Sequence, residues 1–148
     1  MRMIKISRFA ASIAMAVAST AVVAHEPEKS GGPAIAVGET VATVFERLVP
    51  NIAGKTLTAL EVSYAPGGKS VSHIHAKSAF IYAHVLSGAI RSQVGDEPAK
   101  VYRAGEGWYE NPGSHHKISE NASATEPAKL LAVIIADNGD VLTVPEHQ

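Results

Sequence analysis

From Gly38 onward the sequence is a succession of short apolar runs, each closed by glycine, proline or another turn-forming residue. Thr56–Tyr64 alternates apolar and polar residues before Pro66-Gly67-Gly68, which we expect to end that strand. Phe80–Leu86 is an apolar run of the kind that forms a buried strand. Runs that recur about every 8–12 residues, with no sustained helical period, are typical of an all-β sandwich or barrel. The sequence therefore predicts an all-β fold.

The second half of the chain contains the same kind of run. Further strands are predicted at Ala89–Val94, Lys100–Arg103, Gly107–Glu110, His116–Ser119, Lys129–Ala136 and Val141–Val144. The segment Gly95-Asp96-Glu97-Pro98 separates the first two of these strands and is a hairpin signal. Thr40–Leu48 is the one segment for which we consider a short helix.

The first 24 residues are typical of a secretory signal peptide. Three basic residues precede an apolar run over Phe9–Val23, and the compact residues Val22-Val23-Ala24 suit cleavage after Ala24. The alternative is an uncleaved anchor, but the run is short for a bilayer span and rich in alanine and serine. We therefore expect a periplasmic or secreted protein without a stable membrane anchor after cleavage. The expected organisation is a signal peptide at 1–24, a flexible leader at 25–37 and one folded domain at 38–148.

The composition limits the chemistry that this domain can perform. The chain contains seven histidines and no cysteine, which excludes disulfides, thiolate zinc sites and iron–sulfur clusters. Its formal net charge is −1, and residues 25–148 carry 10 basic and 14 acidic residues, a net charge of −4. Such a balance argues against nucleic-acid binding. Metal chemistry would have to use histidine, methionine or carboxylate ligands.

Two of the histidines lie two residues apart. In His73-Ile74-His75, a strand conformation would place both imidazoles on one face, within reach of one metal ion. His115 and His116 follow a Pro-Gly turn, and strand alternation allows one of them to point inward. Each feature alone also fits a solvated surface, so the prediction of a metal site depends on the two segments meeting.

Together the two segments resemble the cupin family of small β-barrels. Its first motif is a glycine, five residues, His-x-His, a glutamate and a closing glycine, and here Gly67 is followed after five residues by His73-Ile74-His75 and later by Gly88. Its second motif has a glycine, Pro-x-Gly and a histidine. Here Gly105 and His116 match, and Asn111-Pro112-Gly113 stands for Pro-x-Gly with Asn111 in place of the proline. The resemblance implies the cupin double-stranded β-helix, a jelly-roll barrel, with a metal held by His73, His75 and His116.

The chain departs from the family pattern at the glutamate. That position falls at Phe80 or Ile81, and neither side chain can bind a metal. Glu110, just before Asn111-Pro112, could restore the carboxylate or could be a solvated strand end. His84 either faces outward with Phe80 and Tyr82 or, in a shifted register, turns inward as a further ligand or its support. His115 is expected beside the site.

Three interpretations fit these residues. One is a metalloenzyme of the dioxygenase or isomerase type, with Fe, Mn, Ni, Cu or Zn and a small chelating substrate. The alternative is a non-catalytic periplasmic module that binds a small ligand or a metal, and a degenerate cupin with remnant histidines is a third reading. Whether the protein is an enzyme stays open at this stage. The family resemblance implies a homodimer, and the aromatic face of Phe80 and Tyr82 is a candidate contact.

Overall fold

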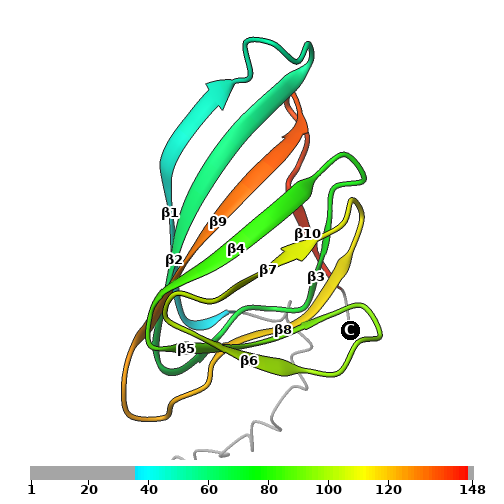
Figure 1. Ribbon diagram of the computed structural model, residues 1–148. Coiled ribbons are helices and arrows are strands. Elements are labelled where there is room, and N and C mark those ends of the chain that lie inside the picture. The colour runs from blue at the N-terminus through cyan, green and yellow to red at the C-terminus, as the bar shows by residue number, and fades with distance from the viewer. Residues whose placement is uncertain (1–35, 147–148) are drawn as a thin grey trace, which may run out of the picture. The chain divides into compact units, whose positions relative to one another are not determined.

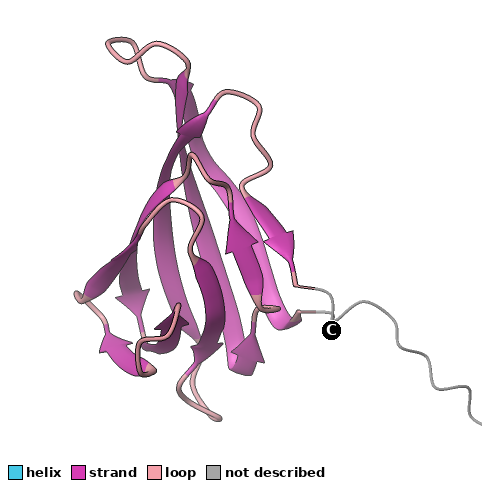
Figure 2. Cartoon of the chain, turned by 90° about the vertical axis from the view of Figure 1, so that its right-hand side faces the viewer, coloured by secondary structure: helices cyan, strands magenta, loops and turns pink. Residues whose placement is uncertain are grey.

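The computed structural model describes residues 36–146, and these residues form strands and loops without any helix (Figures 1 and 2). The ten strands are β1 (Val37–Leu48), β2 (Lys55–Lys69), β3 (His73–His75), β4 (Phe80–Ser87), β5 (Ala89–Val94), β6 (Lys100–Arg103), β7 (Gly107–Glu110), β8 (His115–Asn121), β9 (Ala128–Asp137) and β10 (Thr143–Pro145). The predicted all-β class is confirmed. Within the described range there is no helix long and apolar enough to cross a membrane.

The strands form two sheets that face each other across the core (Figure 1). One sheet has the order β1-β2-β9-β4-β7, and the other has the order β10-β3-β8-β5-β6. The sheets join where Lys69, at the end of the long strand β2, pairs with Glu120 of β8. All pairings are antiparallel, as in a jelly roll, and the predicted hairpin between β5 and β6 is present.

Alternation along β4 builds much of the core. Ile81, Ala83 and Val85 point inward and are at most 2% exposed, whereas Phe80 and Tyr82 point outward and are about half exposed. Ile90 on β5 is fully buried on the opposite sheet. Burying an isoleucine or valine side chain stabilises the fold by about 1.5–3 kcal/mol. The core therefore fixes which face of β4 lines the interior.

Two local expectations were wrong. Thr40–Leu48 is part of strand β1 and not a helix, because it pairs with β2 along almost its whole length. Pro66-Gly67-Gly68 does not end β2, which continues to Lys69. The β1–β2 register jumps between Tyr64 and Lys69, so residues 65–68 form a bulge that is not paired with β1. A proline at this bulge removes no hydrogen bond between the two strands.

The expected signal peptide and most of the expected leader lie outside the described residues, as do His25 and His147. Strand β1 begins at Val37, the last residue of the expected leader.

Candidate metal centre

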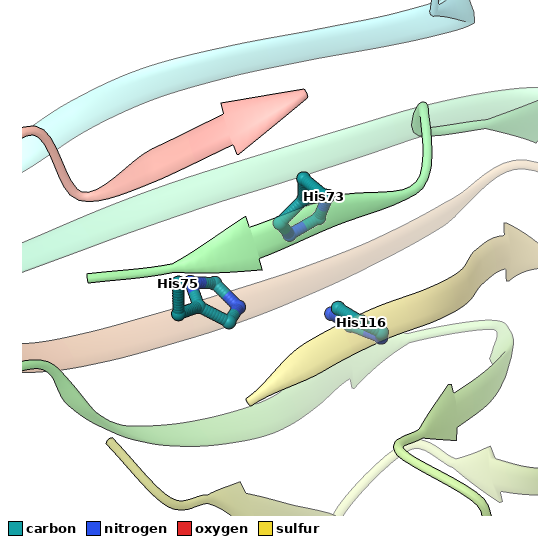
Figure 3. A group of neighbouring side chains, drawn as sticks. All are labelled: His73, His75 and His116. Carbon is teal, nitrogen blue, oxygen red and sulfur yellow. The ribbon is translucent and has the colours of Figure 1, made fainter. Parts of the chain in front are cut away.

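Three histidines meet on the inner face of one sheet. His73 and His75 lie on β3, and His116 lies on the neighbouring strand β8, directly opposite His73 (Figure 3). The ring centroids are 4.8 Å apart for His73 and His75, and 5.2 Å apart for His73 and His116. One ring nitrogen of each residue lies within 4.8 Å of those of the other two. The structure therefore brings together the three residues that the resemblance implied.

The short strand β3 is held in place by both neighbours. β3 pairs with β10 on one side and β8 on the other. The Pro-Gly turn before β8 adds two backbone bonds to this segment, from His75 N to the Ser114 carbonyl and from Gly113 N to the Ala76 carbonyl. Gly113 has a φ of +73°, a left-handed conformation that favours glycine. This turn therefore fixes the distance between the two histidine segments.

Each imidazole has one nitrogen engaged by a neighbouring group. His73 Nδ1 donates to the Val71 carbonyl at 2.7 Å, and His75 Nδ1 donates to the Leu142 carbonyl at 3.3 Å. His116 Nε2 is hydrogen-bonded to Ser92 Oγ at 2.9 Å. A carbonyl can only accept, so Nε2 of His73 and of His75 is left with its lone pair. Such outer partners orient histidines that bind metals.

Burial keeps the rings of His73 and His116 in the neutral form that a metal requires. It lowers the pKa of His116 to about 4, despite the nearby Glu110 carboxylate. It also lowers the pKa of His73, against the opposing hydrogen bond to Val71. A neutral imidazole offers a lone pair, whereas an imidazolium does not.

Glu110 lies beside the histidines. Its side chain is 2% exposed, so the alternative of a solvated strand end is wrong. Glu110 Oε2 is 3.0 Å from His75 Nε2, and Oε1 is 3.1 Å from His116 Nδ1. Trp108 Nε1 donates to Oε1 at 3.0 Å. Burial opposes ionisation, but the interactions with His75, His116 and Trp108 hold the pKa of Glu110 below its usual value.

A cavity of about 330 Å³ opens over the histidines. Most of its wall is apolar and comes from the β1-β2-β9-β4-β7 sheet, which faces the histidines: Val41, Leu60, Val62, Ile81, Ala83, Leu130, Ala132 and Ile134. Part of the wall is a polar chain. Tyr64 is hydrogen-bonded to Ser70 at 2.6 Å and to Ser119 at 2.9 Å, and Ser70 donates to Glu39. No local sequence pattern predicts these hydrogen bonds, because the four residues come from three distant strands and the loop before β3.

The other two candidate residues lie away from the cluster. His84 is on the outward side of β4, where its Nδ1 is 3.2 Å from the hydroxyl of the half-exposed Tyr82. His115 Nε2 contacts Ser72 Oγ at 2.8 Å and Glu146 Oε2 at 3.1 Å. Neither residue belongs to the three-histidine group. Strand alternation explains both positions.

The donor set fits a divalent transition metal. Three buried or half-buried imidazoles converge. In His73 and His75 the Nδ1 atom is hydrogen-bonded to a backbone carbonyl, so the lone pair of Nε2 is free to bind a metal. His75 Nε2 is buried and has no hydrogen-bond partner among residues 36–146. An orphaned buried nitrogen is costly in a folded protein unless another partner satisfies it. Imidazole suits zinc, copper, iron and nickel.

Comparison with known proteins places this fold among characterised families. A family model described as a cupin domain matches residues 60–134, which contain all three histidines. No curated protein matches the chain at a significant level.

Several solved structures have a similar fold. An uncharacterised protein with a double-stranded β-helix domain from Klebsiella pneumoniae has a TM-score of 0.59 at 18% identity, covering 83% of this chain and 90% of its own. A cupin-2 domain protein from Rhodospirillum rubrum has a TM-score of 0.57 at 16% identity, covering 84% and 73%. A recombinant oxalate oxidase in complex with glycolate has a TM-score of 0.55 at 24% identity, covering 72% and 54%. With the family match, the fold and the histidine pattern lead to one conclusion: the chain belongs to the cupin family.

Proposed function

We propose that this cupin binds one divalent metal ion through His73, His75 and His116 and uses it to hold a small chelating ligand in the cavity. The observation that carries the proposal is the convergence of three imidazoles whose outer nitrogens are already engaged. A surface histidine cluster would not need such support, whereas ligating histidines usually have it.

When bound, a divalent ion supplies a Lewis-acidic centre with open positions for an oxygen-chelating ligand. The chain's own residues select what reaches that centre. Apolar side chains such as Val62, Ile81 and Leu130 exclude water and favour an apolar body on the ligand. Tyr64 and Ser119 offer hydroxyl groups to a polar substituent. The ligand class is therefore a small molecule with a chelating oxygen pair and an apolar body.

Within this function, we favour a metal-dependent oxidoreductase or isomerase. The similarity of fold to an oxalate oxidase crystallised with glycolate, a small chelating acid, supports this choice. One observation favours the alternative, a non-catalytic ligand-binding module. Apart from Glu110, the described cavity wall carries one carboxylate, Glu39, which accepts a hydrogen bond from Ser70. Turnover of a chelating substrate by the metal-loaded protein would decide for the enzyme.

We further propose that the protein is exported with cleavage after Ala24 and forms a homodimer. The basic and apolar N-terminal segment supports export. Cell fractionation and the intact mass of the recovered protein test it, and a cytoplasmic protein that retains residues 1–24 would contradict it. The exposed aromatic side chains of Phe80, Tyr82 and Tyr109 support a dimer contact.

The metal-binding proposal is tested by elemental analysis and calorimetric titration of the purified protein. We expect about one equivalent of a transition metal, chosen from Fe, Mn, Ni, Cu and Zn, and lost binding in the His73→Ala/His75→Ala variant. His84→Ala, which removes a histidine outside the cluster, is the matched control and should bind as the wild type does. Wild-type protein that binds none of these metals would overturn the proposal.

A further inference from the structure

We propose that Glu110, from β7, is a fourth and anionic ligand of the same ion. The inference rests on the proposed metal site and adds to it a residue from outside both histidine segments. It also identifies where the carboxylate at this site comes from. Ile81 occupies one of the two candidate positions of the family glutamate, and the acid lies on the neighbouring strand.

The register of two strands places this carboxylate. β4 and β7 are antiparallel neighbours, and Ile81 of β4 pairs directly with Glu110 of β7. Cα atoms of such a pair are about 4.5–5.5 Å apart, and their side chains share a face. Both side chains are 2% exposed and line the cavity. An acid at position 110 therefore reaches the region that an acid at position 81 would reach.

The buried negative charge of Glu110 needs a positive charge nearby to balance it. No lysine or arginine within residues 36–146 forms an ion pair with it, and the imidazoles of His75 and His116, which lie 3.0 and 3.1 Å from it, carry a charge only when protonated. A buried carboxylate without a fixed positive charge is strongly disfavoured, and such groups are usually paired or bound to a metal. The two histidines are themselves the expected metal ligands. A divalent ion between all three groups would balance the carboxylate.

The contact between Glu110 and His75 has the form expected of two ligands. His75 Nδ1 donates to a carbonyl, so Nε2 carries the lone pair, and Nε2 lies 3.0 Å from Glu110 Oε2. Nε2 nevertheless has no hydrogen-bond partner among the described residues, so the oxygen lies off the axis of the nitrogen lone pair. Two ligand atoms about 2.1 Å from one ion are about 3.0 Å apart at a right angle and about 3.4 Å apart at the tetrahedral angle. The contacts of 3.0 and 3.1 Å match the first case.

Neighbouring side chains hold the carboxylate in this position. The Trp108 indole donates to Oε1 at 3.0 Å, and the Ser114 hydroxyl donates to Oε2 at 3.4 Å. Trp108 is itself buried at 8% exposure, and it is the one tryptophan of the chain. Its fluorescence therefore reports on the Glu110 environment without any label.

Calorimetric titration with Zn²⁺ tests the inference in wild type, Glu110→Gln and Glu61→Gln. Glu61→Gln removes a carboxylate that pairs with Lys129 outside the cavity wall, so it is the matched control. We expect Glu110→Gln to weaken Zn²⁺ binding by more than about 100-fold, beyond the 10–100-fold typical of an outer partner. The visible spectrum of the Co²⁺-loaded protein should also change in this variant. Zn²⁺ should change the Trp108 fluorescence and the carboxylate infrared bands of the wild type.

The outcomes separate the two proposals. Wild-type binding that His73→Ala/His75→Ala abolishes and Glu110→Gln leaves unchanged would overturn the role of Glu110 alone. A loss below 100-fold with an unchanged Co²⁺ spectrum would make Glu110 a positioning residue and would also overturn it. Unaltered wild-type carboxylate bands on Zn²⁺ binding would overturn it even if the variant fails to fold. Absence of any metal binding by the wild type would overturn the proposed function itself.

Discussion

The buried phenol of Tyr64 predicts a specific loss of stability at alkaline pH. Its side chain is 2% exposed and is hydrogen-bonded to Ser70 and Ser119 on the cavity wall. Burial raises the pKa of Tyr64 from 10.0 to about 12, because a phenolate would lose its hydration there. Since the folded value is the higher one, the native state holds the proton more tightly than the unfolded chain. The contribution to stability is complete below pH 10 and is lost as the pH rises through 12.

The size of this contribution follows from the shift. Two pH units correspond to about 2–3 kcal/mol of unfolding free energy. The Tyr64→Phe variant lacks the ionisable group, so the lysines and the other tyrosines affect it as they affect the wild type. The difference in stability between the two proteins should therefore fall by about 2 kcal/mol between pH 9 and pH 12.

Urea denaturation at a series of pH values measures this difference. Tyrosinate absorbance of the folded proteins at each pH gives an independent record, in which wild type and variant should diverge only near pH 12. If wild type and Tyr64→Phe lose stability in parallel from pH 9 to pH 12, the reasoning from burial is refuted.

Two further predictions concern the backbone and the outer face. Gly88→Ala should lower the free energy of unfolding by about 1–3 kcal/mol more than Gly95→Ala, as measured by urea denaturation. Both glycines have a positive φ, but a Cβ at Gly88 would lie 2.7 Å from the Pro127 carbonyl oxygen, whereas a Cβ at Gly95 has no atom within 4 Å. Equal losses of stability in the two variants would count against this explanation. Tyr82→Glu should convert the expected dimer to a monomer in analytical ultracentrifugation, whereas Val101→Glu on β6 should not; an unchanged mass for Tyr82→Glu rules out this face.

The turn-forming residues between strands explain which strands could be predicted from the sequence. Ala89–Val94, Lys100–Arg103 and Gly107–Glu110 are strands with the expected bounds, because turn residues mark their ends. β1 was missed because it is an edge strand with both faces largely exposed, so its sequence has no clear alternation. The bulge in β2 was missed because Pro66-Gly67-Gly68 is equally compatible with a turn.

The residues of the candidate site also fall into those with a local sequence signal and those without one. The spacing within His73-Ile74-His75 and the turn before His116 are local signals, and the structure brings these residues together. The burial of Glu110 has no local signal, because an acid before a Pro-Gly turn is typical of an exposed strand end. Its position depends on the β4–β7 register, and Ser92 reaches His116 through the β5–β8 register. Such long-range pairings cannot be read from one sequence.

The direct pairing of Ile81 with Glu110 also has an evolutionary consequence. An acid can pass from one strand to the other through an ancestor that carries both, and either copy can then be lost while the charge keeps its location. The order of such residues along the chain would change although their arrangement in space does not. Searches for distant relatives of this protein should therefore compare positions that are paired across strands and not a fixed interval after the histidines.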